Sequence, residues 1–418
     1  MAITIVSTPY EHTPGYNEQW HVASGTNVAQ TNFKYVVRTI IDGETTTQKF
    51  SPRPDNNLLY FNPQRIVESY LRNDYQFDID EPTPATNSIK KVIVAIDEEY
   101  GSPVSGFTGS SGDYYVWNAA YNAHDFSAFT FTTPTGTDPA KELSLAPANG
   151  AYENSETIHF DQKYLMKTWH RGFGAAIIRV LYVYCYDSAG NLIQSAEIYN
   201  SYYDTSISDT YFLTTVNMSP YGLNLIETNH PALIGIKYDA LLSVVPPATA
   251  RYLYEWKTAS GGTVSSNQGE VFIDDFCSNY DRYVVHFLNR LDNYDPFTFN
   301  LVSVDESKKE VKEYRNSPYY LNTSNKLVYV NSKGDRQNYS TVITNKITLN
   351  SDWVSDTTYA WLKDLFMSPS IKLEDASGNL YAVTCTMKDY KKRKVVNDKI
   401  FNVTVELEFD YQDIRQRG

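Results

Sequence analysis

The sequence predicts a mainly β protein, built from several antiparallel β-sandwich or barrel-like units with a few short helices packed on the sheets. Residues 401–409 alternate between apolar and polar side chains, which is the period-two pattern of a strand with one buried face. Turn sequences separate other apolar runs. The chain also has 35 tyrosines among 418 residues, many of them on period-two segments.

Tyrosine joins a large apolar ring to a polar tip, and it therefore suits surfaces that are dry in one assembled state and wet in another. On a period-two strand, half of the side chains face away from the core of a single sheet. The tyrosine content therefore favours an interaction or assembly protein. A β protein with ordinary tyrosine-rich cores is the alternative interpretation.

Hairpins are expected over residues 32–50, turning at the Asp-Gly pair 42–43, and over residues 177–199, turning at 187–191. A turn related to the second one recurs at 375–380. These last two turns resemble calcium-binding loops in part. Neither places its glycine or a distal glutamate where such a loop requires them, so we interpret both as hairpin turns.

Short helices are expected in three places. The first has Asn62 as its N-cap and Pro63 at its first position, the second follows Ser355 and ends before Pro369, and the third begins after Asp161. Their apolar stripes contain Ile66, Val67, Tyr70 and Leu71, then Trp361, Leu362, Leu365 and Phe366, and lastly Leu165 and Trp169. These helices should pack on sheets.

Two stretches predict domain boundaries. Residues 133–147 are poor in order-forming residues, and Val245-Pro246-Pro247-Ala248 breaks any regular element. The predicted domains are an N-terminal β-domain with one short helix at 1–140, a middle β-sandwich domain at 141–247, and a C-terminal α+β domain with a terminal antiparallel sheet at 248–418.

The net charge of -13 argues against a nucleic-acid-binding surface over most of the chain. Residues 95–160 contain nine acidic residues and one basic residue, Lys141. The basic cluster at 388–394 is interpreted as a solvated loop tip. No apolar run approaches the length of a membrane span, and the N-terminus lacks the pattern of a secretory signal. We therefore expect synthesis in the cytosol and no membrane partner.

No pattern for catalysis, cofactor binding or metal binding stands out. The sequence contains no nucleophile elbow, phosphate-binding loop, dinucleotide fingerprint or zinc-binding helix. Its seven histidines have no metal-like spacing, and its three cysteines are far apart and expected to be free, buried thiols. We expect a protein that is not an enzyme, with no cofactor and no metal. A β-rich glycoside hydrolase would need a pair of carboxylates across a cleft.

Exposed aromatic residues are the remaining candidates for a functional site. Trp117 follows a Gly/Ser loop together with Tyr114 and Tyr115, and these three are the predicted exposed or interface aromatics. Trp353 and Trp361 are assigned to the core-facing side of the second helix.

A family resemblance extends over most of the chain. The segments that carry it are Thr8-Pro9-Tyr10, Pro14-Gly15-Tyr16-Asn17, Asn32-Phe33-Lys34-Tyr35, Ser51-Pro52-Arg53-Pro54 and Ile66–Tyr70, then Arg282–Arg290, Tyr294–Phe299, Trp353–Ser368 and Val395–Leu407. They resemble segments in structural proteins of tailed double-stranded DNA phages that infect Bacteroidota, crAss-like phages included. These motifs are structural, and the resemblance carries no catalytic residue onto this chain.

The resemblance implies a virion protein assembled in the host cytoplasm. It would form a homo-oligomeric ring, six- or twelve-fold, in the neck or tail; neck ring, tail adaptor and baseplate hub all remain open. Its partners would be copies of itself, portal or neck proteins and other tail proteins, and genomic DNA would pass only as channel cargo. The acidic stretch 95–160 would then line the channel. The alternative is a carbohydrate-binding tail component that contacts host surface polysaccharide.

Overall fold

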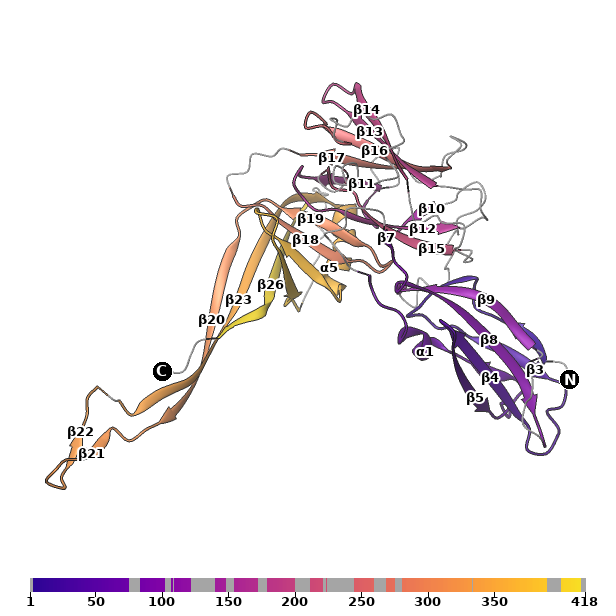
Figure 1. Cartoon of the computed structure of the whole chain (residues 1–418), viewed down its shortest axis with the longest axis horizontal. Helices are drawn as coiled ribbons and strands as arrows, with labels where there is room; N and C mark the ends of the chain where they lie inside the picture. The colour runs from indigo at the N-terminus through magenta and orange to yellow at the C-terminus, as the bar shows by residue number, and fades with distance from the viewer. Residues whose placement is uncertain are drawn as a thin grey trace. The chain divides into compact units, whose positions relative to one another are not determined.

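The computed structural model is mainly β, as the sequence predicts, with several antiparallel sheets (Figure 1). It describes the chain except for residues 1–2, 75–82, 102–106, 108, 122–139, 148–153, 172–178, 200–210, 221–222, 224–243, 259–267, 275–279, 333, 389–399 and 415–418. None of the helices in the described part of the chain has the length and apolar character that crossing a bilayer demands.

The chain divides into two compact units. Unit 1 consists of Met1–Asp275 together with Asn289–Asp295, and unit 2 of Phe276–Leu288 together with Pro296–Gly418. The boundaries expected near residues 140 and 247 both lie within the first unit, and the division into three domains stays a prediction.

The first part of unit 1 has two sheets around one hydrophobic core. The five-stranded sheet has the order β2 (His12–Pro14), β9 (Gly109–Trp117), β8 (Ile89–Glu99), β4 (Lys34–Ile41), β5 (Glu44–Phe50), and the three-stranded sheet has the order β1 (Ile3–Ser7), β3 (His21–Gly25), β6 (Leu59–Phe61). Val37, Val92 and Val94 from the first sheet share the core with Leu59 and Phe61 from the second.

The first predicted hairpin and helix are both present. β4 and β5 pair across Asp42 and Gly43, whose φ angles of 50° and 80° are those of a type I′ turn. The helix α1 (Gln64–Glu68) begins directly after Pro63, and the Asn62 side chain accepts a hydrogen bond from the Gln64 backbone N–H at 3.1 Å. The N-cap position is Pro63, one residue after the predicted Asn62, although the Asn62 side chain bonds the first helical N–H.

The second part of unit 1 also has two sheets. Their orders are β10 (Ala140–Glu142), β12 (Leu165–Arg171), β15 (Tyr211–Asn217), β7 (Thr83–Pro84), and β11 (Asn154–Ile158), β17 (Gln268–Ile273), β16 (Arg251–Thr258), β13 (Arg179–Tyr186), β14 (Leu192–Tyr199). β16 and β17 lie C-terminal to the boundary expected near 247, yet β16 pairs with β13 and β17 pairs with β11.

The prediction of a helix after Asp161 is wrong. Residues Leu165–Arg171 form β12, which pairs with β10 on one side and β15 on the other. Leu165 and Trp169 are both buried and four residues apart, which fits one face of a strand as well as one face of a helix. The two neighbouring strands decide the outcome, because they satisfy the backbone hydrogen bonds of β12.

Unit 2 is built on a seven-stranded sheet. Its order is β19 (Tyr294–Phe299), β18 (Tyr283–Leu288), β24 (Ile371–Glu374), β25 (Leu380–Cys385), β26 (Ile400–Ile414), β23 (Arg336–Ser355), β20 (Val304–Arg315). Along β26, Val403, Val405 and Leu407 are buried while the residues between them are exposed, which confirms the predicted alternation.

Two consecutive helices and a separate small hairpin complete unit 2. α4 (Asp356–Trp361) is capped by the Ser355 side chain, which accepts from the Thr358 backbone N–H, and α5 (Lys363–Met367) ends before Pro369. This confirms the second predicted helix. The small hairpin consists of β21 (Tyr319–Leu321) and β22 (Leu327–Tyr329), between β20 and β23 in the sequence.

Candidate interaction surface

A long hairpin arm in unit 2 carries the densest group of exposed aromatic and aliphatic side chains. Among the described residues, the pairing of β23 with β26 begins at Val342, and residues 311–341, which we name the arm, continue beyond this point (Figure 1). The large hydrophobic residues of the arm that are exposed are Tyr314, Tyr319, Tyr320, Leu321, Leu327, Tyr329 and Tyr339.

The base of the arm is polar on both faces, which explains why no second layer covers it. β20 has eight charged residues among its twelve, and every residue except Val311 is exposed. A strand without an apolar face cannot bury itself in a sandwich. Lysines on an edge strand also discourage unspecific pairing with other chains. The paired ends of β20 and β23 therefore continue away from the sheet without a covering layer.

The tip of the arm is a well-defined turn. Asn322 anchors it, because its side-chain oxygen accepts from the backbone N–H groups of Ser324 and Lys326, both at 3.0 Å. Asn325 takes the left-handed conformation, with φ of 56°, which asparagine tolerates better than most residues. This local geometry sets the register of β21 and β22, in which Tyr319 lies opposite Tyr329.

One face of the tip hairpin is apolar and uncovered. The alternation of a strand places four large side chains on this face, which we name the tip face: Tyr319 (54% exposed), Leu321 (62%), Leu327 (71%) and Tyr329 (49%). The two tyrosine rings contact each other edge to face, with centroids 5.3 Å apart. A two-stranded hairpin alone is at best marginally stable in water, so this face is suited to a partner that covers it.

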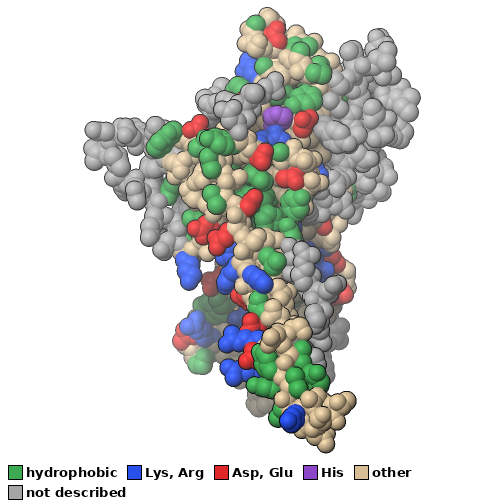
Figure 2. Space-filling model, turned by 90° about the vertical axis from the view of Figure 1, so that its left-hand side faces the viewer, with side chains coloured by type: hydrophobic (Ala, Val, Ile, Leu, Met, Phe, Trp, Pro, Cys, Tyr) green, Lys and Arg blue, Asp and Glu red, His purple; other side chains and the backbone are tan. Residues whose placement is uncertain are grey.

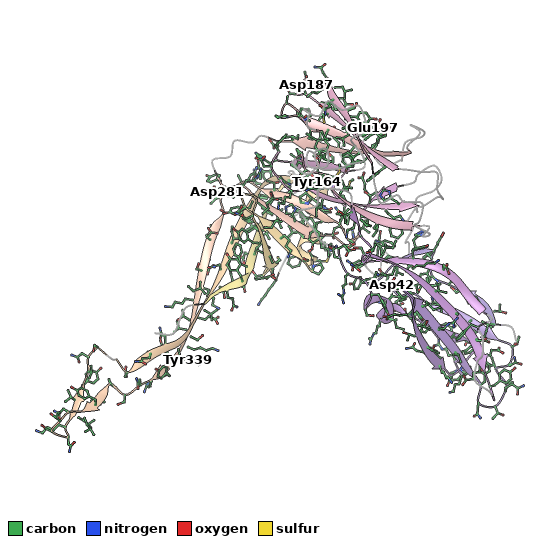
Figure 3. The ribbon with its side chains drawn as sticks, viewed as in Figure 1. Asp42, Tyr164, Asp187, Glu197, Asp281 and Tyr339 are labelled. Carbon is green, nitrogen blue, oxygen red and sulfur yellow. The ribbon has the colours of Figure 1, made fainter. Side chains whose placement is uncertain are left out.

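Two further tyrosines continue the aromatic surface along the arm. The rings of Tyr314 and Tyr339 lie 6.3 Å apart, and both are more than 40% exposed. Figure 3 places Tyr339 on the arm, whereas Tyr164 lies among the strands of unit 1. Figure 2 shows hydrophobic side chains together with Lys and Arg side chains on the arm. The surface is therefore both aromatic and basic.

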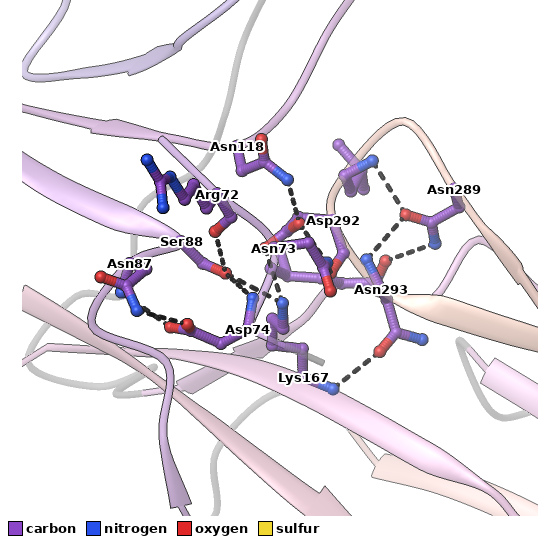
Figure 4. Close-up of polar contacts among 12 residues, drawn as sticks. Arg72, Asn73, Asp74, Asn87, Ser88, Asn118, Lys167, Asn289, Asp292 and Asn293 are labelled. Atoms are coloured by element: carbon purple, nitrogen blue, oxygen red, sulfur yellow. Dashed lines mark hydrogen bonds and ion pairs between the residues drawn. The ribbon is translucent and has the colours of Figure 1, made fainter. Parts of the chain in front are cut away.

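Unit 1 contains a buried ion pair in a polar cluster (Figure 4). The Lys167 ammonium lies 2.7 Å from the Asp292 carboxylate, and their side chains are 3% and 0% exposed. Asn73 and Asn118 donate to the same carboxylate, and Ser88 lies 3.0 Å from the ammonium. Burial raises the pKa of Asp292, while Lys167 and the hydrogen bonds oppose this shift. This cluster joins segments far apart in the sequence and is fully enclosed, so we assign it a structural role.

A second buried group combines carboxylates and tyrosines. Tyr254 Oη donates to Glu142 at 3.1 Å, and both residues are buried. Burial, followed by the nearby Asp295 carboxylate, raises the pKa of Glu156 well above its ordinary value. Burial likewise raises the pKa of Tyr164. These acids lie in the core of unit 1, so they do not present a carboxylate pair to a polysaccharide.

Histidines are also placed in the core. His286 of β18 lies 2.7 Å from Glu374 of β24, and both side chains are 0% exposed. This partner is 88 residues away in the sequence. Burial lowers the pKa of His21 to about 4, so it is neutral at pH 7. Within the described ranges, no group of three or more His, Cys, Asp or Glu side chains is arranged to hold a metal ion.

The prediction that Tyr114, Tyr115 and Trp117 are exposed is wrong. Their side chains are 4%, 5% and 0% exposed. β9 lies between β2 and β8, and both of its faces are covered: Tyr114 packs in one core cluster, whereas Tyr115 and Trp117 pack in another. The Trp117 ring contacts that of Trp169 edge to face at 5.0 Å. These residues do not form an interaction surface.

The structure also corrects the placement of Trp353. It lies in β23 and is 66% exposed, whereas the sequence assigned it to the buried side of a helix. Trp361 is in α4 and buried, as expected.

The turns at Asp187 and Asp375 are hairpin turns, as predicted, because each aspartate accepts hydrogen bonds from backbone N–H groups of its own turn. The Asn191 side chain lowers the pKa of Asp187, and the backbone bonds add to this effect. Burial opposes the shift at Asp375, where the Asn379 side chain and the backbone bonds lower the pKa.

Two surface expectations fall partly outside the described residues. The acidic stretch 95–160 includes residues 102–106, 108, 122–139 and 148–153, and the basic cluster 388–394 is described only at Lys388. Whether the acidic stretch faces a channel therefore stays a prediction.

Of the cysteines, Cys185 is a buried free thiol and Cys385 a half-buried one, and Cys277 lies outside the described part.

None of the residues predicted for a functional site lies in the arm. A signal was present, because Tyr319 and Leu321 alternate before an asparagine-containing turn and Leu327 and Tyr329 alternate after it. This pattern predicts a hairpin, but it does not reveal that the apolar face lacks a covering layer. Comparison of the chain with protein-family models and with curated proteins finds no match.

Proposed function

We propose that this chain is a non-enzymatic structural protein that assembles with neighbouring subunits through its arm. The observation that carries the proposal is the tip face, where Tyr319, Leu321, Leu327 and Tyr329 are each at least 49% exposed on a hairpin with no core of its own. A monomer gains nothing from this arrangement. Because these side chains are already partly buried, covering their exposed half to two thirds would stabilise the complex by roughly 1–2 kcal/mol each, before the costs of association.

The composition of the arm also fits an interface. Tyrosine and arginine are enriched at binding hot spots, and the arm combines exposed tyrosines with Arg315 and Arg336, which lie opposite each other at the last pair of the β20–β23 ladder. The asparagine-anchored turn restricts the tip before binding, which reduces the entropy lost on association. The arm is thus an element prepared for docking.

The setting we propose is the neck or tail of a tailed double-stranded DNA phage. There the chain would form a homo-oligomeric ring, six- or twelve-fold, between portal-side and distal tail components, with DNA passing as channel cargo. The resemblance of the sequence to structural proteins of phages that infect Bacteroidota supports this setting, and so does a β-rich fold with a projecting arm. The alternative, a carbohydrate-binding tail component, depended on Trp117, which is buried.

The location of the protein in virions tests this proposal. Purified particles of a phage whose genome encodes the chain should contain it in a fixed copy number. Gold-labelled antibodies raised against the purified protein should bind the neck or tail in electron micrographs. Absence of the protein from purified particles would overturn the proposal, and so would label confined to the capsid shell.

A further inference from the structure

The two units of the chain differ in charge. Unit 1 contains 17 basic and 32 acidic residues, a net charge of -15, whereas unit 2 contains 19 basic and 17 acidic residues, a net charge of +2. Within unit 2, the arm contains five basic and two acidic residues, a net charge of +3. The arm is therefore basic as well as apolar. Unit 1, in contrast, is strongly acidic.

Unit 1 has an exposed aromatic surface next to carboxylates. Trp20, Tyr16 and Tyr60 are 45%, 44% and 37% exposed, and Glu18 and Glu68 lie beside them. We name these five residues the N-terminal patch. The Trp20 indole N–H donates to Glu18 at 2.8 Å, and Glu68 is close enough to Tyr16 to raise the pKa of its hydroxyl, second to burial.

Backbone pairing and side-chain bonds hold this patch together. His21 and Val22 of β3 pair with Phe61 and Tyr60 of β6, and the inward-facing His21 and Phe61 are buried. Val22 and Tyr60 therefore share the outer face of the three-stranded sheet, and Trp20 directly precedes β3. The Gln64 side chain bonds both the Tyr16 carbonyl, at 2.9 Å, and Glu68, at 2.9 Å, which connects the remaining residues to α1.

We propose that the arm of one copy docks on the N-terminal patch of a second copy of this chain. The inference rests on the proposed function, because it takes the arm as the docking element and names its partner. Aromatic and aliphatic side chains of the tip face would cover Trp20, Tyr16 and Tyr60, whose ring already has the Arg53 guanidinium on one face, 4.9 Å from its centroid. Lys326 at the tip turn, which is exposed, would lie opposite Glu18 and Glu68. Opposite charges around an apolar centre are the usual arrangement of a specific interface.

A second copy fits the arm better than a nucleic acid does. Nucleic acid would also attract a basic, aromatic surface, but the chain as a whole carries -13 and would repel a long polyanion beyond the tip. The tip face also contains Leu321 and Leu327, its two most exposed members. Leucine has no aromatic ring on which a base could stack. Unit 1 supplies the negative charge that the arm lacks, together with further aromatic area that the arm could cover.

The proposed contact is heterologous, since one surface of each copy meets a different surface of the next. Such an interface leaves a free arm at one end and a free patch at the other, so association continues until a ring closes or a filament forms. This gives the proposed ring a specific contact. It also makes the contact testable by mixing variants.

The experiment uses the full-length purified chain and two variants of exposed residues. The arm variant is Leu321→Ser with Leu327→Ser, and the patch variant is Glu18→Lys with Trp20→Ser. The control is Leu192→Ser with Ile193→Ser, which removes two exposed apolar side chains of β14. Sedimentation velocity over a concentration series measures self-association, and circular dichroism with thermal unfolding checks that each variant is folded.

We expect the unmodified chain and the control to associate beyond the 47.7 kDa monomer. The arm and patch variants should each associate about tenfold more weakly or worse. A mixture of these two variants should form a 1:1 dimer and no larger species. It would contain one intact arm and one intact patch, enough for a single contact.

Several results would overturn the inference. They are a strictly monomeric unmodified chain at every concentration, an arm variant that associates as well as the control, and a mixture of the two variants that stays monomeric. Retention of a single-stranded oligonucleotide by the unmodified chain but not by Lys326→Glu, without self-association, would assign the arm to nucleic acid instead. None of these results alters the virion location, which the antibody labelling decides separately.

Discussion

Strand β9 and the tip hairpin β21–β22 are both rich in tyrosine, yet they end in opposite environments. β9 has a neighbour strand on each side and a core cluster on each face, so Tyr114, Tyr115 and Trp117 are buried. The tip hairpin has only its own two strands, and Tyr319 and Tyr329 stay about half exposed. Whether a tyrosine is buried therefore depends on the position of its strand in the sheet. Composition alone does not indicate this position.

Removing a large ring from β9 should have the largest effect on stability. We expect Trp117→Ala to lower the free energy of unfolding of unit 1 by about 3–5 kcal/mol, because it deletes a fully buried side chain and leaves a cavity beside Trp169. Urea denaturation followed by tryptophan fluorescence measures the change. The matched control is Trp353→Ala, a strand tryptophan that is 66% exposed. An equal loss in both variants would contradict the assignment of β9 to the core.

Adding a methyl group to a covered face tests the same comparison from the other direction. Gly269 of β17 lies opposite Tyr254, and a Cβ atom at this position would come within 2.1 Å of the tyrosine ring. Gly269→Ala should therefore destabilise unit 1 by about 1–3 kcal/mol through overpacking. Thermal unfolding followed by circular dichroism is the measurement. An unchanged melting temperature would show that the ring has room to move.

A glycine in an exposed turn is the control for Gly269. Gly190 lies in the β13–β14 turn of the same unit, with φ of 83° and no atom within 4 Å of the position of a Cβ. Gly190→Ala should cost only the strain of its left-handed backbone, on the order of 1 kcal/mol. A larger loss for Gly190→Ala than for Gly269→Ala would contradict the packing described here.

The sequence predicted the strands better than their surroundings. The alternation of Val403, Val405 and Leu407, the Asp42-Gly43 turn and the Ser355 cap are local patterns, and each is present in the structure. The failures concern contacts between distant segments. Trp169 could belong to a helix or a strand until β10 and β15 are known to flank it.

The candidate site could not be found from the sequence for the same reason. The segment Tyr319–Tyr329 reads as an ordinary hairpin, and its exposure follows from the absence of an apolar face on β20 and from the end of the β23–β26 pairing at Val342. Neither fact is local to the tip. The buried Lys167–Asp292 pair likewise joins residues 125 positions apart, and no sequence pattern predicts it.

The pH dependence of stability should reveal the buried acid Glu156. Burial raises its pKa in the folded state, so this residue favours folding below the ordinary pKa of a glutamate and loses that advantage as the pH rises through the folded-state value. Glutamine imitates the protonated acid. We therefore expect Glu156→Gln to stabilise the protein by about 0.5–2 kcal/mol at pH 8 and to have little effect at pH 4.

Unfolding in urea at the two pH values measures this difference. Glu197→Gln in β14, which is half-exposed, serves as the control and should show a smaller dependence on pH. A stabilisation by Glu156→Gln that is equal at pH 4 and pH 8 would show that it does not arise from the ionisation of this acid. It would place the cause in packing or hydrogen bonding of the amide.

The smallest effect on stability is expected at the tip face, where the effect on assembly should be greatest. Leu321→Ser with Leu327→Ser removes side chains that are 62% and 71% exposed, so the free energy of unfolding of the monomer should change by no more than about 0.5 kcal/mol for each substitution. Urea denaturation of the monomeric variant provides the value. A loss as large as that of Trp117→Ala would mean that the tip packs within its own chain. The two regions would then differ only in degree, and the arm would have no surface to offer a partner.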